Sequence, residues 1–220
     1  MKDGTKREIN ILLERYPVLA GMRERLTACV ELMSESFCTG GKLLVCGNGG
    51  SAADSLHIAG ELMKGFVLER PLPEKLREVL RTGYPDDAAY YIANLQGALP
   101  VISLTGEISL MTAYSNDKAA DLIFAQQVLG YGRPGDVLLA ISTSGASSNV
   151  IHAARVAKAT GMKVVSLTGQ GGGMLAKLSD VLLDVPTNVT HHVQELHLPV
   201  YHALCLALEQ ELFGGQGSCT

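Results

Sequence analysis

The sequence predicts an α/β protein built on a doubly wound, five-stranded parallel sheet flanked by helices. Short apolar runs alternate along the chain with longer helical stretches, as expected when helices connect parallel strands. Loops of small residues follow two of these runs at the points where helices begin. The chain has 220 residues, of which 47% are hydrophobic and 18% charged, so it can bury a sizeable core.

The first 40 residues predict a helical arm ahead of the sheet. Their apolar residues recur at three- and four-residue steps and form one stripe. Pro17 is expected to divide the stretch into two helices, and Gly40 and Gly41 to end the second. The stripe must be buried on this domain or on another copy, and it contains Ile9, Leu12, Leu13, Tyr16, Leu19, Met22, Leu26, Cys29, Val30, Met33 and Phe37.

The remaining elements follow the alternation in order. Five apolar runs predict the strands Leu43–Cys46, Pro100–Leu104, Asp136–Ile141, Lys163–Leu167 and Val181–Val185. Helices are predicted from Ala52 and over Lys118–Leu129, Asn149–Thr160 and, as a long closing helix, Thr190–Phe213. Ser115, Asn116 and Asp117 are expected to lie between two helices.

One segment departs from the alternation, although residues 1–220 are expected to form a single domain. Between Leu72 and Leu99 the chain carries a charged helical run, Glu74–Arg81, and a second run, Asp86–Leu95. A turn at Gly83, Tyr84 and Pro85 separates them. Residues 72–99 are therefore predicted to be a helical insertion that covers the site or alters subunit packing.

Composition excludes several classes of partner. A net charge of −4 gives no overall attraction for nucleic acid or acidic membranes. No apolar run is long enough to span a bilayer, and the charged N-terminus lacks the apolar segment of a signal peptide. The five cysteines show no regular framework, which suits a reducing compartment. A cytoplasmic location is expected.

The loop after the first strand is typical of an anion site. Gly47, Asn48, Gly49, Gly50 and Ser51 precede a helix whose free amides and positive dipole end attract negative charge. The loop lacks a P-loop lysine, and Ala52 replaces the third glycine of a dinucleotide fingerprint. On the same helix His57 and Glu61 share a face at i, i+4 spacing, as an ion pair or as two metal ligands.

The loop after the third strand offers four hydroxyl groups at a helix start, on Ser142, Thr143, Ser144 and Ser147. It contains no lysine or arginine. This composition favours a phosphate monoester held by neutral donors, and the alternative is an ordinary helix cap.

The closing helix concentrates histidines with other polar side chains. His191, His192, Gln194, Glu195, His197 and His202 fall within a dozen residues. Imidazole, carboxylate and amide oxygen all suit a transition metal such as zinc. Gln194 and His202 are separated by roughly 12 Å of helix, so sharing one ion requires their side chains to lean together or to come from different copies. The alternative is that the histidines are core residues.

Several motifs together resemble the sugar isomerase (SIS) family, and within it the phosphoheptose isomerase branch. They are CGNGGSAADSLHIAGEL, SND, LLAISTSGASSNVI, VVSLTG and VQELHLPVYH. The resemblance covers Gly41 to Phe213 apart from Leu72–Leu99. It implies a homotetramer with sites near subunit contacts, and interconversion of sedoheptulose 7-phosphate and D-glycero-D-manno-heptose 7-phosphate.

The resemblance also assigns roles to residues. It implies one zinc per subunit, held by His57, Glu61, Gln194 and His202, with Glu61 as the base and His202 as the proton donor. It implies that substrate is bound by Asn48, Gly49, Gly50, Ser51, Glu61, Asn116, Asp117, Ser142, Thr143, Ser144, Ser147 and Gln194.

Two features separate the chain from that pattern. His191 stands where related sequences carry an acidic residue, so one contact to a substrate hydroxyl is expected to be lost or replaced, and the 72–99 segment is longer than the usual link. The alternative function is a non-catalytic SIS module that binds a phosphosugar or a replication-initiation protein. The retained His57, Glu61, Gln194 and His202 favour the enzyme, although an isomerase for a pentose or hexose phosphate is also consistent with the sequence.

Overall fold

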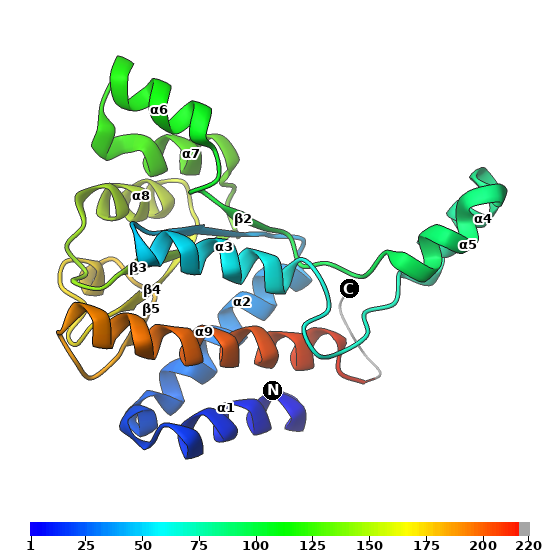
Figure 1. Cartoon of the computed structure of the whole chain (residues 1–220), viewed down its shortest axis with the longest axis horizontal. Helices are drawn as coiled ribbons and strands as arrows, with labels where there is room; N and C mark the ends of the chain where they lie inside the picture. The colour runs from blue at the N-terminus through cyan, green and yellow to red at the C-terminus, as the bar shows by residue number, and fades with distance from the viewer. Residues whose placement is uncertain (216–220) are drawn as a thin grey trace.

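The computed structural model describes residues 1–215 and contains a five-stranded, all-parallel sheet (Figure 1). The strand order is β2-β1-β3-β4-β5, and β1 pairs with β3 in a register that places Leu44 beside Leu138. This arrangement confirms the predicted fold class. The strands are β1 (Leu43–Cys46), β2 (Val101–Ser103), β3 (Val137–Ser142), β4 (Lys163–Thr168) and β5 (Val181–Asp184).

Helices cover both faces of the sheet because its strands are apolar on both sides. Val45 and Leu139 belong to one buried cluster, while their neighbours Leu44 and Leu138 belong to another. The first cluster packs against α2 (Arg23–Cys38), α3 (Gly50–Leu62) and α9 (Thr190–Phe213). The second packs against α7 (Ile123–Tyr131) and α8 (Ser148–Ala159). Alternate side chains of one strand therefore serve two cores.

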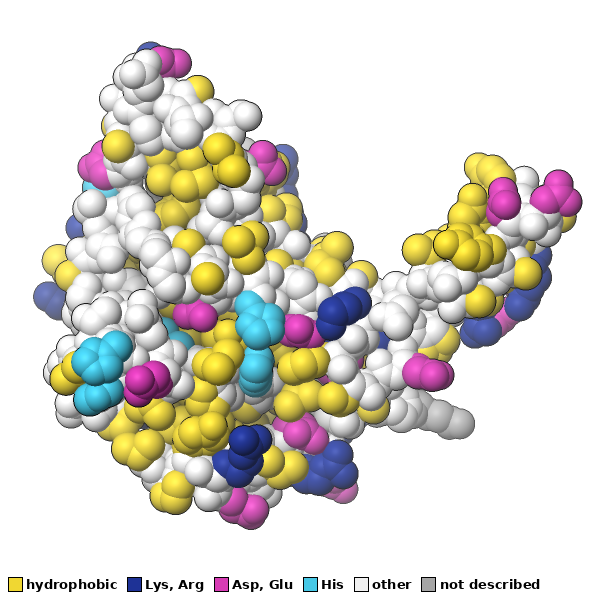
Figure 2. All heavy atoms as spheres, viewed as in Figure 1, with side chains coloured by type: hydrophobic (Ala, Val, Ile, Leu, Met, Phe, Trp, Pro, Cys, Tyr) yellow, Lys and Arg dark blue, Asp and Glu magenta, His cyan; other side chains and the backbone are white. Residues whose placement is uncertain are grey.

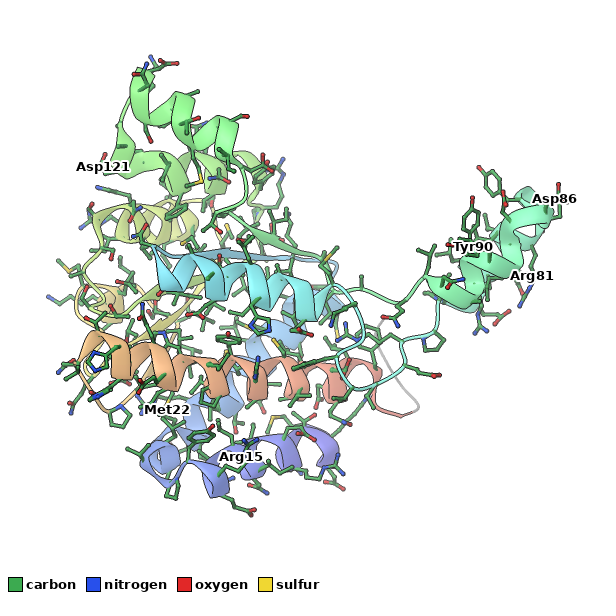
Figure 3. All side chains as sticks on the ribbon, viewed as in Figure 1. Arg15, Met22, Arg81, Asp86, Tyr90 and Asp121 are labelled. Atoms are coloured by element: carbon green, nitrogen blue, oxygen red, sulfur yellow. The ribbon has the colours of Figure 1, made fainter. Side chains whose placement is uncertain are left out.

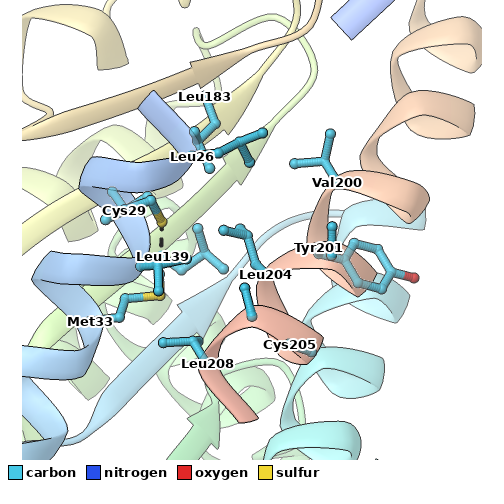
Figure 4. Packing of buried hydrophobic residues seen from close by; sticks show 14 of the residues in the cluster. Leu26, Cys29, Met33, Leu139, Leu183, Val200, Tyr201, Leu204, Cys205 and Leu208 are labelled. Carbon is cyan, nitrogen blue, oxygen red and sulfur yellow. Dashed lines mark hydrogen bonds between the residues drawn. The ribbon is translucent and has the colours of Figure 1, made fainter. Parts of the chain in front are cut away.

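The N-terminal stripe is buried within the same chain. Helix α1 (Asp3–Arg15) packs along α9, and Pro17 opens a 3₁₀ turn, Pro17–Met22, before α2. Leu26, Cys29 and Met33 of α2 meet Val200 and Leu204 of α9 over the sheet (Figure 4). Figure 4 also shows the Tyr201 ring directed out of this core, with its hydroxyl away from Leu204.

The 72–99 segment forms a helical hairpin that projects from the body (Figure 1). Its helices are α4 (Glu74–Gly83) and α5 (Pro85–Asn94), and α4 has no buried residue. Figure 3 shows Asp86 and Tyr90 far from the sheet. The hairpin is fixed at its base, where the Gly97 amide donates to the Arg70 carbonyl at 2.7 Å. Because it points away from the body, it does not cover the predicted site of its own chain.

The predicted break at Ser115–Asp117 is wrong. These residues form the last turn of α6 (Ile108–Asp117). The Ser115 hydroxyl donates to the Met111 carbonyl at 2.6 Å, so it is satisfied inside the helix and does not end it. The helix ends at Lys118, whose backbone leaves the helical region with φ −134° and ψ −90°. A short 3₁₀ turn, Ala120–Leu122, then precedes α7.

No described helix is both long and apolar enough to cross a membrane. Cys29, Cys46 and Cys205 are buried free thiols, and burial raises the pKa of each to about 12. Cys219 lies outside the described residues.

His197 is a fully buried core histidine of α9, and burial lowers its pKa to about 4. The unfolded chain takes up a proton here below about pH 6.5, whereas the folded protein does so only near pH 4. Stability contributed by the neutral ring is therefore complete above that range and is lost as pH falls through it. We predict that His197→Leu reduces the change in unfolding free energy between about pH 7 and pH 5 by roughly 1–2 kcal/mol.

Urea denaturation of protein stripped of metal measures this difference. His192→Leu, at an exposed position of the same helix, is the matched control and should retain the full dependence. An unchanged pH dependence in the His197 variant would contradict the prediction.

Candidate active site

The two predicted small-residue loops meet at the centre of the sheet. Strands β1 and β3 are neighbours, although one connection leads away to β2 and the other to β4, so their carboxyl ends form the topological switch point. The loop after β1 turns at Gly49, whose φ of 57° favours glycine. The loop after β3 turns at Gly145, where a β-carbon would collide with the Gly172 carbonyl. Both loops lead directly into helices, α3 and α8.

Reciprocal amide hydrogen bonds join the two loops. Asn48 Nδ2 donates to Asn149 Oδ1 at 2.8 Å, and Asn149 Nδ2 donates to Asn48 Oδ1 at 2.9 Å. Beside this pair lies a shallow pocket lined by Asn48, Ala120, Asp121, Ser147, Ser148 and Asn149. The pocket therefore unites polar groups from both loops.

The serine loop keeps its hydroxyl groups close together. Ser142 Oγ and Ser147 Oγ lie 3.0 Å apart, and Ser144 Oγ accepts from the Ala146 amide at 3.2 Å. Ser144 is exposed and its hydroxyl proton remains available. Ser147 occupies the N-cap position of α8 without a side-chain capping hydrogen bond, so the loop presents hydroxyls and the positive end of a helix together.

Helices α3 and α9 run parallel, and three contacts along their length show it. At the first turn of α3, Gln194 Nε2 lies so close to Gly50 that a β-carbon there would be 2.5 Å away. Midway, His57 Nδ1 hydrogen-bonds Tyr201 Oη at 3.0 Å. Beyond the last turn, the Phe66 amide donates to Glu209 Oε1 at 2.7 Å. These contacts pair two helices that are distant along the chain.

Glu209 and Arg70 fix this arrangement from within. Both side chains are fully buried, and Arg70 Nε donates to Glu209 Oε1 at 2.8 Å. The same carboxylate accepts the amides of Phe66, Val67 and Leu68. The Arg70 guanidinium also lies 4.6 Å from the centre of the Phe213 ring. The loop that follows α3 is thereby tied to α9.

From the middle of α3 to just beyond its end, His57, Glu61 and Lys64 form a row of polar side chains. His57 Nε2 lies 3.4 Å from Glu61 Oε1, and Lys64 Nζ lies 2.6 Å from Glu61 Oε2. The hydrogen bond from Lys64 lowers the pKa of Glu61, and the positive charge of Lys64 acts in the same direction. Glu61 is therefore held as a carboxylate. Figure 2 shows histidine side chains gathered over α3 and α9, between acidic and basic groups.

His202 completes this group from α9. Its ring centre lies 5.0 Å from that of His57 and 5.6 Å from that of Phe66. Burial lowers the pKa of His202, and the nearby His57 adds to the effect. His202 also borders an apolar groove of about 230 Å³ between α1 and α9, whose other lining residues include Ile11, Leu12, Leu198 and Pro199.

Tyr201 and Asp54 lie next to His57. The Tyr201 hydroxyl hydrogen-bonds His57 Nδ1 at 3.0 Å, and the Asp54 carboxylate lies near it. Burial raises the pKa of Tyr201, and the negative charge of Asp54 adds to the rise. Asp54 stands one helical turn before His57 on α3, so the three residues share one face of the contact between the helices.

Part of this group fits a divalent metal. The buried Nε2 of His202 has no hydrogen-bond partner, so this nitrogen is free to coordinate a metal ion. Two ligands of a tetrahedral zinc are separated by about 3.3–3.6 Å, which matches the 3.4 Å between His57 and Glu61. Among the described residues, however, no three His, Cys, Asp or Glu side chains form a ready metal centre.

The remaining predicted site residues do not all lie close to His57 or to the two loops. Gln194 lies at the Gly50 end of α3, about 10 Å of helix away from His57. Asn116 and Asp117 are exposed at the end of α6, where Asn116 Nδ2 donates to Asp117 Oδ1 at 2.9 Å. Among the described residues, no hydrogen bond joins that pair to the two loops, and Asp121 borders the pocket instead.

The sequence interpretation missed several residues of this region. Asn149 joins the loops, and Asp54, Lys64 and Tyr201 surround His57 and Glu61. Asp54 and Lys64 carried a local signal, because they lie three residues before His57 and three after Glu61 on one helix. Tyr201 carried none, since its contact depends on how α9 packs.

Comparisons with known proteins assign the family. A model of the SIS domain matches residues 8–98 and 87–169. The phosphoheptose isomerase of Akkermansia muciniphila is 33% identical over 215 residues, covering 98% of this chain and all of that protein. The phosphoheptose isomerase of Shewanella loihica is 41% identical over 193 residues, covering 86% of this chain and 85% of that protein.

Solved structures agree. The phosphoheptose isomerase of Neisseria gonorrhoeae superposes with a TM-score of 0.70 at 34% identity, and 93% of each chain is covered. That of Francisella tularensis gives 0.70 at 32% identity, covering 85% of this chain and 86% of the other. The chain belongs to the SIS domain family. Within that family it falls in the phosphoheptose isomerase branch, whose members are aldose–ketose isomerases.

The buried Arg70–Glu209 pair is predicted to stabilise the folded protein. Glu209→Gln leaves the Arg70 charge uncompensated and removes one acceptor from the loop amides. We expect a loss of roughly 3–5 kcal/mol in unfolding free energy, the usual cost of breaking a buried ion pair. Chemical denaturation measures it, with Glu24→Gln on the exposed face of α2 as the matched control.

The double variant Arg70→Met/Glu209→Gln sharpens that test. It leaves no unpaired charge in the interior, so it should recover part of the lost stability. A single variant as stable as the control, or a double variant whose losses simply add, would contradict the role assigned to this pair.

Proposed function

We propose that this protein interconverts sedoheptulose 7-phosphate and D-glycero-D-manno-heptose 7-phosphate. The observation that carries the proposal is the meeting of His57, Glu61 and His202 beside a switch-point loop suited to phosphate. Relatives named phosphoheptose isomerase, matched over most of their length, support the same substrate. An anion site and an acid–base group together are what isomerisation of a sugar phosphate requires.

The phosphate binds at the serine loop in this proposal. Neutral hydroxyls, backbone amides and the N-terminus of α8 hold the anion there, with Ser142, Thr143, Ser144 and Ser147 as donors. The sugar extends toward His57 past Asn48 and the start of α3. That path is about 10 Å of helix between Gly50 and His57. Ser51 and Gln194 lie near its beginning.

Zinc is the proposed cofactor, one ion per subunit. His57, Glu61 and His202 would hold it, with Gln194 as the fourth ligand by family resemblance. These side chains are of the types that zinc prefers. When bound, such an ion supplies Lewis-acid polarisation of the sugar oxygens.

Glu61 and His202 move the protons in the proposed reaction. Aldose–ketose isomerisation transfers a proton between neighbouring carbons through an enediolate, so it needs a base at carbon and an acid at oxygen. Glu61 is the base, and the contact with Lys64 must loosen before it can accept a proton because that contact favours the carboxylate. His202 is the acid that donates a proton to the oxygen. The Phe66 ring packs edge to face against the His202 ring.

We also propose that the protein acts as a homotetramer in the cytoplasm. The projecting hairpin supports association, because Val79, Tyr84 and Tyr90 are more than half exposed on it. A short amphipathic hairpin whose two helices pack mainly on each other is stabilised by packing against another surface.

The alternative is a non-catalytic module that binds a phosphosugar or a replication-initiation protein. The two functions separate in one experiment, the turnover of C5, C6 and C7 ketose phosphates with and without zinc. Turnover that is fastest with the C7 substrate supports the proposal. Tight binding of a sugar phosphate without any turnover would establish the alternative.

Ser144→Ala tests the phosphate position. It removes one donor to a bound anion, worth roughly 1.5–3 kcal/mol, so KM should rise about 10- to 100-fold with little change in kcat. Steady-state kinetics measure both constants. Ser109→Ala, on exposed α6, is the matched control. An unaltered KM in the Ser144 variant would place the phosphate elsewhere.

Glu61→Gln and His202→Asn test the proton transfers. Each should lower kcat by roughly 10²–10⁴, the usual contribution of a positioned acid or base. The double variant should be little worse than either single one, because the two groups act as a unit.

Matched controls are Glu24→Gln and His192→Asn, both exposed and outside the cluster. Zinc content is measured for every variant by elemental analysis, because loss of metal would imitate loss of a base. Variants that keep both zinc and full turnover would remove Glu61 and His202 from the reaction.

A further inference from the structure

Asn149 lies in the site region, and the proposed reaction gives it no role. It is the second residue of α8, directly after the serine loop, and its side chain is half-buried. Its amide group exchanges two hydrogen bonds with Asn48 of the loop after β1, at 2.8 and 2.9 Å. Its oxygen also accepts the Val150 backbone amide at 3.0 Å. Asn149 therefore joins the two loops and is itself fixed to its own helix.

The hydrogen bond from Val150 determines which way both side-chain amides point. A backbone N–H only donates, so the atom of Asn149 that it meets is the oxygen. The nitrogen of Asn149 then donates to Asn48 Oδ1, and Asn48 Nδ2 donates to the oxygen of Asn149. Reversal of either amide, or of both, would place two donors or two acceptors opposite each other. The start of α8 thus selects one orientation of Asn48.

This orientation leaves half of the hydrogen-bonding capacity of Asn48 free. A side-chain amide has two N–H donors and two oxygen lone pairs. The exchange with Asn149 uses one of each, so Asn48 retains one donor and one acceptor. Hydroxyl groups can accept from the donor and donate to the acceptor. The free groups of Asn48 therefore match the hydroxyls of a sugar chain.

The pocket beside the pair has the same chemical preference. Asn48 and Asn149 line it together with Ser147, Ser148 and Asp121. The Asp121 carboxylate can accept a hydrogen bond from a hydroxyl, whereas its negative charge opposes a phosphate. This pocket therefore suits the hydroxyl-bearing part of a sugar phosphate, next to the loop proposed for the phosphate itself.

We propose that Asn149 is a positioning residue that orients Asn48 toward a hydroxyl of the bound sugar phosphate. Asn149 acts through Asn48 and not through a substrate contact of its own. The inference rests on the sugar phosphate of the proposed function, and it adds the residue that sets the direction of one substrate contact. It involves no metal ion, because the hydrogen bonds that carry it lie between the two loops.

A double-mutant cycle tests whether Asn149 acts through Asn48. Equilibrium dialysis of sedoheptulose 7-phosphate against the full-length protein measures affinity without requiring turnover. Asn149→Ala should bind roughly 3- to 10-fold more weakly, as expected for the loss of one oriented hydrogen bond. Asn48→Ala should lose at least as much, and the double variant should be no weaker than Asn48→Ala alone.

Two results of this cycle would overturn the inference. Losses that multiply in the double variant would mean that Asn149 acts independently of Asn48. Tighter binding by Asn149→Ala would mean that the pair of amides obstructs the ligand. Asn10→Ala, exposed on α1, is the matched control and should bind as the unaltered protein does.

Inorganic phosphate separates positioning from a purely structural role at the start of α8. It has no sugar hydroxyls, but in the proposed function it occupies the same serine loop. Dialysis of radiolabelled phosphate should therefore give the same affinity for Asn149→Ala and unaltered protein. Equal losses for phosphate and sugar phosphate would show that the substitution distorts the loop, and would overturn the positioning role. Far-UV circular dichroism confirms that each variant is folded.

Steady-state kinetics provide the second readout. The hydroxyl bound by Asn48 is contacted in the substrate and in the transition state alike, so Asn149→Ala should raise KM with little change in kcat. A loss confined to kcat would place Asn149 at the chemical step and contradict the inference.

The outcomes separate this inference from the proposed function. Protein that binds sedoheptulose 7-phosphate without converting it would refute the isomerase activity, while the binding cycle would still decide the role of Asn149. Full turnover with unchanged affinity in Asn149→Ala would refute the positioning role alone. Protein that binds no sugar phosphate would refute both.

Discussion

The carboxylate of Glu209 is the constraint on which the rest of the site depends. A fully buried charge is stable only when it is paired and hydrogen-bonded, and Glu209 meets both conditions with Arg70 and three successive loop amides. These bonds join the end of α3 to the end of α9. At the other end, the Gln194 side chain packs against Gly50 and brings the first turns of the two helices together. Two helices held at both ends have one register, and that register places His57 against Tyr201 and His202.

The fold could be predicted because its signals are local. Strands buried on both faces are continuous apolar runs, and small residues mark the loops where such strands lead into helices. The spacing of His57 and Glu61 is local too. The residues that complete the site were not visible in this way. Tyr201 and Glu209 act through the packing of α9 on α3, and Asn149 acts through the adjacency of β1 and β3. These are contacts between segments separated by about a hundred residues or more.

The site residues assigned from family resemblance show a second limit of prediction from sequence, because a motif does not give the positions of its residues in space. Gln194 and His202 lie on one helix, and helical geometry separates their backbones by roughly 12 Å. A shared motif gives the identity of such residues without giving their meeting point. Asn116 and Asp117 likewise end α6, while Asp121, after the next turn, borders the pocket. The β1 and serine loops are joined to each other by hydrogen bonds, whereas the roles assigned to Asn116 and Asp117 stay predictions.

The dipole of α3 explains why the two ends of the site differ in charge. Its first turn presents free amides and a positive partial charge, which favours an anion beside the glycine loop. Glu61 lies in the last turn, where the negative end of the helix disfavours a carboxylate. That position is tolerable only with positive charge close by. Lys64 provides it at one oxygen, and His57 Nε2 lies 3.4 Å from the other. The zinc ion proposed to bind at Glu61 and His57 would add positive charge at this end of the helix, where the dipole favours a cation.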